Sequence, residues 1–358
     1  MSSESPLRTG ARLGVAGSHF WTMRRWRGAG RAVAAVCCSM ALSGCGGSSP
    51  SSPASGSGVL EGRTVNAVDG GAAPGVALEV GTRSTTADGN GYFRVDVGKP
   101  STFDLRARGS GIVERESAIV GPGAEPARVS LIPASFDLNS FDQMFRPNGS
   151  LQRWTTQPSL VVLASIMTYF NGERDGYPAT SEQMSDEEIE QLIAHTTEGL
   201  SILTAGRFTG FQAVEIERTA SGTQASVNRP GKIVVGRYNR IVIHANTIGF
   251  GQWALAADGS VRGGAMFLDN DFDKTDKRRR LLRIHELGHA LGMMHVTERT
   301  SIMNPTLGPD VTDFDRGAAS IAFDRPIGNK APDVDPARSP WSQSDDRTLV
   351  WAPPVYCR

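Results

Sequence analysis

The stretch that decides the fold is HELGHALGMMH, residues 285–295. Two histidines that are four residues apart share one face of a helix, because an α-helix has about 3.6 residues per turn. His285 and His289 can therefore hold one metal ion from a single helix. Glu286 lies next to the first of them, where its carboxylate can reach water at the metal. This spacing predicts a metal-binding helix with a proton acceptor beside it.

A third histidine follows a glycine in the same stretch. Gly292 can end the helix and turn the chain sharply, which would bring His295 back as a third ligand. Three neutral imidazoles and an open fourth position predict a catalytic zinc site, because structural zinc is usually enclosed by four protein ligands. The alternative is an ordinary helix whose histidines merely pack or face solvent. This alternative does not account for the methionine turn that follows, Ser301-Ile302-Met303-Asn304-Pro305. That alternative is the weaker one.

The extended motif and its methionine turn resemble those of the metzincin zinc endopeptidases, and most of all the matrixins. Matrixins have a Met-x-Pro turn, which residues 303–305 match. Pro305 stands where astacin-like and serralysin-like relatives carry a tyrosine that swings onto the metal. The resemblance is sharp from about Gly263 onward to this turn. It implies an α/β (α+β) zincin-like catalytic domain with a mixed twisted sheet and an active-site helix.

The resemblance also implies a function. One catalytic Zn²⁺ would be held by His285, His289 and His295, and Glu286 would be the general base. Met303 would have a structural role and pack beneath the histidines. The implied activity is zinc-dependent hydrolysis of peptide bonds in extended protein or peptide substrates. The alternatives are a zinc enzyme acting on another bond and an inert surface protein that binds or adheres. Catalytically inactive relatives of such enzymes tend to lose the glutamate or one of the histidine ligands. This chain keeps Glu286 and the three histidines.

Composition limits the other function classes. The chain has 358 residues, enough for two domains. Lysine plus arginine equals aspartate plus glutamate, at 37 each, so no global field favours nucleic acid or an anionic membrane. Four cysteines are too few for a disulfide-built scaffold. Cys357 is interpreted as a dispensable tail thiol or an unpaired surface thiol, and a monomer is the default expectation.

The first 45 residues resemble a bacterial lipoprotein signal. Residues 24–31 carry four arginines, and an apolar run at 32–42 follows that is too short to span a bilayer. Leu42-Ser43-Gly44-Cys45 resembles a lipobox, which implies cleavage before Cys45 and lipid attachment to its sulfur. The alternative is an ordinary signal peptide with a chance cysteine. Residues 46–58 would be a flexible Gly/Ser/Pro tether, so we expect an exported protein anchored at the cell envelope.

Residues 59–133 are expected to form a small all-β sandwich. Val76–Val80 and Tyr92–Val97 carry strand-forming residues. The turn-rich stretch Thr85–Phe93 resembles the hairpin of carboxypeptidase regulatory-like modules. Such a module would act as a spacer, a binding platform or a propeptide. No cysteine lies between Cys45 and the zinc helix, so latency through a propeptide thiol on the zinc is not expected.

Residues 134–326 are expected to form the catalytic domain. Residues 136–149 would be a connector, and Trp154 would begin the domain. Ser185–Glu188 is a capping box that predicts a helix, on which His195 is interpreted as a packed or solvated histidine. A last helix is expected from Val311 to about Phe323. Further strands are expected at Leu160–Leu163, Val214–Ile216 and Ile241–Ile243.

The strand before the zinc helix is expected at Gly263–Leu268. By the resemblance it would be an edge strand that lines the cleft and pairs with substrate. Asp269, Asp271 and Asp273 could offer oxygens to Ca²⁺ or could cap the next helix, and the sequence leaves both open. Residues 296–300 would shape the substrate side-chain pocket. Residues 327–358 would be a proline-rich tail, either an ordered wrap or a loose end.

Overall fold

The computed structural model describes residues 58–168, 176–239, 246–337 and 349–358. These residues all belong to one compact unit, Pro53–Arg358. The predicted lipobox with Cys45, most of the tether and the strand expected at Ile241–Ile243 lie outside them. In the described ranges, no helix combines the length and the hydropathy that crossing a membrane requires.

The first part of the described chain forms two small sheets. One has the strand order β4-β1-β7, with β1 at Val59–Asn66, β4 at Tyr92–Asp96 and β7 at Ala127–Leu131. The other has the order β3-β2-β5-β6, with β2 at Ala77–Val80, β3 at Arg83–Thr86, β5 at Ser101–Arg108 and β6 at Arg115–Gly121. Leu60 and Phe93 from the first sheet share one hydrophobic cluster with Leu78 and Leu105 from the second. The strands expected from residues 76 and 92 are confirmed, whereas the likeness to carboxypeptidase regulatory-like modules stays a prediction.

A larger mixed sheet of nine strands follows, seven of them in the order β11-β9-β8-β12-β14-β13-β15, with β10 paired to β8 and β16 paired to β13. Strands β8, β12 and β14 are parallel neighbours, β10 runs parallel to β8, and β13 is antiparallel to β14. Nearly every residue of β8 and β12 is buried, as expected for strands covered on both faces. The bounds are β8 Ser159–Met167, β9 Tyr177–Gln183, β10 Val214–Glu217, β11 Gln224–Ala225, β12 Lys232–Tyr238, β13 Gly249–Leu255, β14 Val261–Asp269, β15 Val350–Trp351 and β16 Val355–Cys357.

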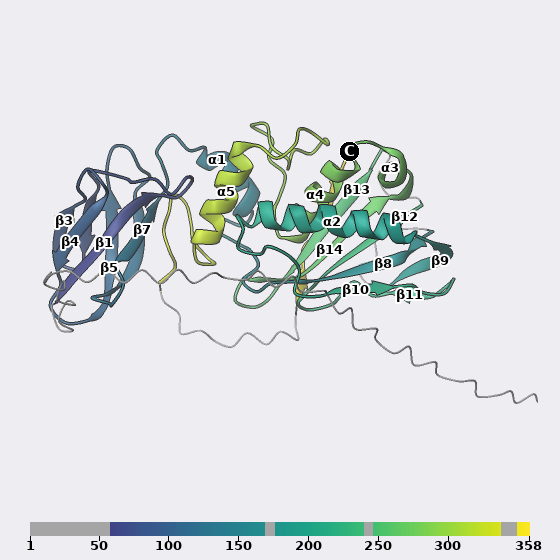
Figure 1. Cartoon of the computed structure of the whole chain (residues 1–358), viewed down its shortest axis with the longest axis horizontal. Helices are drawn as coiled ribbons and strands as arrows, with labels where there is room; N and C mark the ends of the chain where they lie inside the picture. Colours follow the sequence, from purple (N-terminus) through teal and green to yellow (C-terminus); the bar gives the residue numbers. More distant parts are fainter. Residues whose placement is uncertain (1–57, 169–175, 240–245, 338–348) are drawn as a thin grey trace, which may run out of the picture. The chain divides into compact units, whose positions relative to one another are not determined.

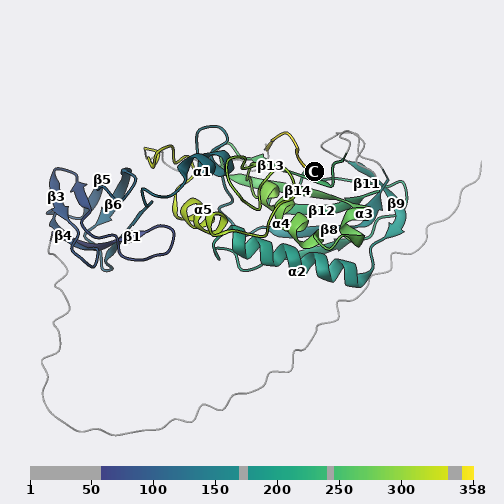
Figure 2. The same ribbon diagram turned by 90° about the horizontal axis from the view of Figure 1, so that it is seen from above.

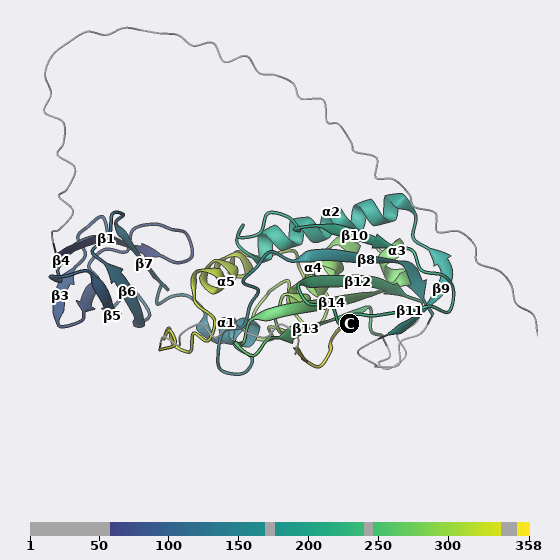
Figure 3. The same cartoon turned by 90° about the horizontal axis from the view of Figure 1, so that it is seen from below.

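Two helices cover one face of this sheet (Figures 1, 2 and 3). They are α2, Asp186–Leu203, and the zinc-motif helix α4, Arg279–Ala290. The predicted capping box is confirmed, because the Ser185 side chain accepts from the Glu188 amide while the Glu188 carboxylate accepts from the Ser185 amide. The helix expected near Phe323 is confirmed as α5, Asp313–Asp324. A mixed sheet with an active-site helix agrees with the expected α/β class.

The connector expected at residues 136–149 is wrong, because this segment contains helix α1, Leu138–Phe145. Asp137 caps the helix by accepting from the Ser140 amide at 3.1 Å. Phe141 and Phe145 are both buried in the main core. Asn139 is exposed, and Asp142 and Gln143 of this short amphipathic helix are only partly buried.

The edge strand expected at Gly263–Leu268 is also wrong. Those residues form most of β14, which has β12 on one side and β13 on the other. Strand β13 lies between β14 and the end of the chain, because β15 and β16 both pair with its outer side. Its sequence, GFGQWAL, contains two glycines, which strands usually avoid, and so gave little strand signal.

The three aspartates near residue 270 do not converge. Asp269 caps helix α3, Asn270–Thr275, by accepting from the Phe272 amide at 3.0 Å. Asp271 is exposed, and Asp273 is buried. Within the described ranges, the clusters able to hold a metal include none of these carboxylates. The capping interpretation therefore holds for Asp269.

Asp273 lies in a buried ion-pair network. Its carboxylate accepts from the Arg237 side chain at 2.6 Å and from the Arg283 side chain at 2.7 and 2.8 Å. Arg237 also donates to Glu188 at 2.8 Å. The His195 ring lies 3.1 Å from Arg283, and because a guanidinium can only donate, its Nδ1 is the acceptor. His195 is thus a packed histidine, and the network joins α4 to β12, α3 and α2.

Candidate metal centre

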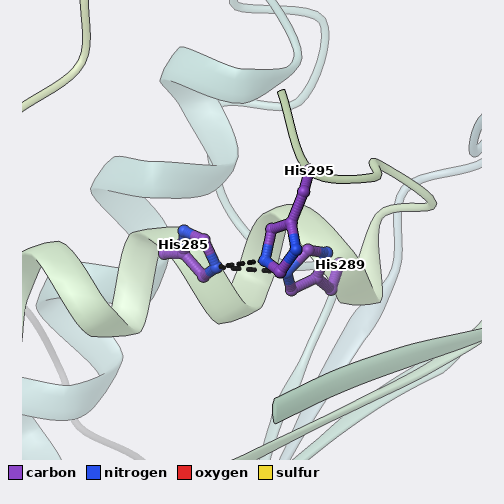
Figure 4. Close-up of side chains that lie close together, drawn as sticks. All are labelled: His285, His289 and His295. Atoms are coloured by element: carbon purple, nitrogen blue, oxygen red, sulfur yellow. Dashed lines mark hydrogen bonds between the residues drawn. The ribbon is translucent and has the colours of Figure 1, made fainter. Parts of the chain in front are cut away.

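Helix α4 and the turn after it bring the three motif histidines together (Figure 4). His285 and His289 are buried on one face of the helix, as their spacing predicts. The helix ends at Ala290, and Gly292 adopts a φ of +98°, a conformation that L side chains rarely take. The chain then turns back so that the His295 ring meets the other two.

The distances between the three rings fit a zinc ion. Their Nε2 atoms lie 3.1 Å apart for His285 and His289, 3.2 Å for His289 and His295, and 3.3 Å for His285 and His295. Zinc bonds imidazole nitrogen at about 2.0–2.1 Å in tetrahedral geometry, which holds two ligand nitrogens about 3.3 Å apart. The residues present therefore match the ion that the motif implies.

The hydrogen bonds behind the rings also fit a cation between them. The Nδ1 atom of His285 lies 2.7 Å from the Ile302 carbonyl, and that of His289 lies 2.7 Å from the Met293 carbonyl. A carbonyl can only accept, so both Nδ1 atoms carry the proton and both neutral rings present a lone pair at Nε2. Two lone pairs at 3.1 Å repel each other unless a cation lies between them.

Burial keeps these rings neutral. It lowers the pKa of His285 to about 3 and that of His295 to about 4, and it lowers the pKa of His289 well below its usual value. Neutral imidazole is the form that binds metal. At neutral pH a metal ion can therefore bind these rings without displacing a proton from them.

Glu286 is fully buried beside the first histidine. Neither of its carboxylate oxygens has a hydrogen-bond partner among the described residues. Burial raises its pKa well above the usual value for a glutamate, because an unpaired carboxylate is costly away from water. A positive ion held by the neighbouring rings would favour the charged form, so the carboxylate also fits a metal at this place.

Two glycines of β13 let the sheet approach this helix. A Cβ atom at Gly249 would lie 2.6 Å from the Glu286 carboxylate, and one at Gly251 would lie 2.4 Å from the Cβ of His289. Any larger residue would push β13 away from α4. These positions were missed in the sequence, where glycine gave only a weak strand signal.

The methionine turn lies directly under the helix. Met303 is fully buried, and a Cβ atom at Gly288 would lie 2.4 Å from its sulfur. The Val296 amide donates to the Met303 carbonyl at 2.9 Å, and the Asn304 side chain donates to the Val296 carbonyl at 2.7 Å. The loop that carries His295 is thereby fixed to the turn.

Asp315 is a site residue that the sequence did not reveal. Its buried carboxylate, in the first turn of α5, accepts from the Ser301 hydroxyl at 2.5 Å and from the Ile302 amide at 3.0 Å. The Ile302 carbonyl in turn accepts from His285. Asp315 therefore helps to fix the Ile302 carbonyl that orients the His285 ring. The only signal in the sequence was its capping-box spacing from Thr312, which the structure confirms.

We expect Asp315→Asn to weaken metal binding by about 10–100-fold, the usual effect of removing a group that orients a ligand. The amide keeps the shape of the side chain but replaces one of its two acceptor oxygens by a donor. Asp313→Asn is the matched control, since Asp313 is exposed in the same helical turn. Zinc affinity by competition with a chelator is the measurement. Equal affinity in both variants would show that Asp315 does not orient His285.

A pocket of about 300 Å³ opens beside His295. Its other lining residues are Pro305, Thr306, Tyr356 and Arg358. Residues 296–300, expected to shape a substrate pocket, are not among them. The end of the chain therefore forms part of the wall.

Cys357 lies at the metal centre as well. It is completely buried in strand β16, so its interpretation as a surface thiol was wrong. Its sulfur, a nitrogen of His285 and a carboxylate oxygen of Glu286 all lie within 4.8 Å of one another. The structure thus adds a fifth chemical group to the predicted set of three histidines and one glutamate.

Comparison with known families agrees with this geometry. The Matrixin family model matches residues 239–316, a span that contains the three histidines, Glu286 and the methionine turn. No curated protein matches the chain. The matched span, the histidine cluster and the mixed sheet together support a matrixin-like metzincin domain in this part of the chain.

Proposed function

We propose that the protein is a zinc-dependent endopeptidase that hydrolyses peptide bonds in extended protein substrates. The observation that carries the proposal is the pair of buried, neutral rings whose Nε2 lone pairs face each other at 3.1 Å. Such a pair fits a cation, and the unpaired carboxylate of Glu286 beside it fits a proton acceptor.

The residues have distinct roles in this proposal. His285, His289 and His295 hold the ion, and zinc in such a site supplies Lewis acidity that polarises a carbonyl and acidifies water. Glu286 takes the proton from the attacking water and delivers it to the amine that leaves. Met303 takes no chemical step and supports the rings from below. No step requires a residue outside the described part of the chain.

The place of action is proposed from the sequence alone. The arginine-rich start, the apolar run and the lipobox-like residues ending at Cys45 support export and a lipid anchor at the bacterial cell envelope. The equal numbers of acidic and basic residues favour a protein or peptide partner over nucleic acid.

The test is incubation with a peptide library, with and without a zinc chelator. It uses the full chain. Cleavage that stops with the chelator and returns with zinc is expected. Cleavage that survives metal removal would contradict the proposal, and stoichiometric zinc without cleavage would indicate an inert binding protein.

A further inference from the structure

The β-module, as we call the two small sheets of residues 59–133, pairs through its main chain with a segment that follows helix α5. The Glu116 amide donates to the Asp333 carbonyl at 3.0 Å, and the Asp335 amide donates to the Glu116 carbonyl at 2.8 Å. Glu116 lies in β6, the outer strand of its sheet. An outer strand carries main-chain groups that can pair with another segment, and here a segment from the far end of the catalytic domain covers them.

Asp333 is also the centre of a buried ion-pair cluster. Its carboxylate accepts from the Arg325 side chain at 2.8 and 2.7 Å and from the Arg115 side chain at 2.9 Å, and all three residues are buried. Arg325 also donates to the Ser130 carbonyl at 3.1 Å. Arg115 and Ser130 belong to the β-module, whereas Arg325 directly follows α5. Because removal of one partner would leave buried charge uncompensated, the cluster holds the β-module to the catalytic domain.

Helix α5 itself packs against the β-module. The Ser320 hydroxyl donates to the Ala67 carbonyl at 2.6 Å. One turn earlier, a Cβ atom at Gly317 would lie 3.0 Å from the Val68 side chain, so the two segments approach closely there. Ala67 lies in the same hydrophobic core as Phe314, the second residue of α5. The loop that follows β1 therefore contacts the middle of α5.

The same helix supports the metal centre. Asp315, in its first turn, accepts from the Ile302 amide at 3.0 Å, and the Ile302 carbonyl lies 2.7 Å from Nδ1 of His285. Gly317 and Ser320, which contact the β-module, follow Asp315 by two and five positions. Because a helix moves as a rigid element over so short a distance, a shift of α5 would also move the Asp315 carboxylate away from the Ile302 amide.

We propose that the β-module is a fixed part of the catalytic unit, which holds helix α5 in place and so keeps the His285 ring oriented for the metal. It acts on the metal centre as a positioning element. The release that a propeptide undergoes would expose the buried Arg325–Asp333 pair and remove Ala67 from the main core. The β-module therefore remains in the active protein. The proposal concerns folding and metal binding, so it does not depend on the proposed cleavage of peptides.

Tryptophan fluorescence follows the unfolding of the catalytic domain separately from that of the β-module. The chain has six tryptophans, and none of them lies in residues 59–133. Trp154 and Trp253 are buried in the main core, so their emission changes when the catalytic domain unfolds. A substitution in the β-module can therefore change the unfolding seen by fluorescence only if the two parts are coupled.

The first test compares urea unfolding of the metal-free full chain with that of Arg115→Gln, followed by tryptophan fluorescence. The midpoint is expected to fall by at least about 0.5 M, because the change removes one partner from the buried cluster. Arg83→Gln is the matched control, since Arg83 is exposed in β3, and it should keep the midpoint within about 0.2 M of the parent. Equal midpoints in the two variants would overturn the proposal.

Leu78→Ala tests the same coupling from inside the β-module. Leu78 is fully buried in the hydrophobic cluster that the two small sheets share. Its truncation removes core contacts of the β-module, so the fluorescence midpoint is expected to fall here as well. If circular dichroism showed that strand structure is lost before the fluorescence changes, the β-module would unfold alone, which contradicts a fixed catalytic unit.

The second test examines whether the β-module acts on the metal centre through α5. Gly317→Val crowds Val68 and pushes α5 away from the β-module. Zinc affinity, measured by competition with a chelator, is expected to fall about tenfold, the lower end of the usual range for loss of an orienting group. Val68→Ala in the same chain relieves the crowding and should restore most of the affinity. An unchanged affinity in Gly317→Val, or a loss that Val68→Ala does not restore, would overturn the positioning role.

The third measurement is the mass of the zinc-bound protein recovered after expression of the full chain. The β-module is expected to be present in it. A product that begins after residue 133 and binds zinc as tightly as the longer chain would show that the β-module is removable, and would overturn the proposal. All three measurements can be made whether or not the protein cleaves a peptide. Failure of the proposed endopeptidase function is therefore distinguishable from failure of this proposal.

Discussion

Replacement of Glu286 by glutamine is expected to lower peptide cleavage by about 10²–10⁴-fold, the range that general acid–base catalysis contributes. The amide has nearly the same shape but cannot take a proton from water. Zinc should remain bound at one ion per chain, because the three imidazoles are unchanged. The measurement is the cleavage rate of a peptide found in the library, made on the full chain with its zinc content determined in parallel.

Glu298→Gln is the control for this experiment. Glu298 lies in the loop after His295 and is exposed, so the same chemical change there should leave the rate within about twofold. The metal-free Glu286→Gln chain should be no less stable than the parent, since the carboxylate that it replaces is buried without a partner. Cleavage at the parent rate by Glu286→Gln would contradict the assigned role.

Replacement of Asp273 by asparagine is expected to destabilise the fold by about 3–5 kcal/mol, because removing one partner leaves buried charge uncompensated. Asp273 and its partners Arg237 and Arg283 are 0 %, 1 % and 0 % exposed. After the change, the partly exposed Glu188 would be the only carboxylate among the described residues that pairs with either of these two buried guanidinium groups. The measurement is the free energy of unfolding from urea titration of the metal-free protein, followed by circular dichroism.

Asp271→Asn is the matched control, since Asp271 is exposed two residues earlier in helix α3. It should change the free energy of unfolding by no more than about 0.5 kcal/mol. Equal losses in the two variants would show that the buried pairs with Arg237 and Arg283 do not hold the structure. Because Arg283 lies two residues before His285, we also expect Asp273→Asn to weaken zinc binding.

The parts of this site that the sequence predicted are those set by local spacing. His285 and His289 share a helix face because they are four residues apart, and the capping box at Ser185 involves residues three apart. Gly292 turns the chain because of its own backbone freedom. Interactions of this kind depend on a few consecutive residues, so the sequence shows them directly.

The parts that were missed depend on partners far along the chain. Nothing near Cys357 indicates that it pairs with Gly249, more than 100 residues earlier, because strand pairing leaves no local pattern at such a distance. In the same way, Asp273 looked like a calcium ligand or a cap until Arg237 came into contact with it from β12. The edge position of β14 was expected from the resemblance, and the strand that covers this edge, β13, gave little strand signal because of its two glycines.

The central claim is that three imidazole nitrogens hold one zinc ion. The most direct measurement is anomalous diffraction at the zinc absorption edge from a crystal of the purified protein. The account predicts one strong peak, about 2.0–2.1 Å from the Nε2 atoms of His285, His289 and His295. Rings that point apart, or the absence of a peak between them in zinc-supplemented crystals, would contradict it.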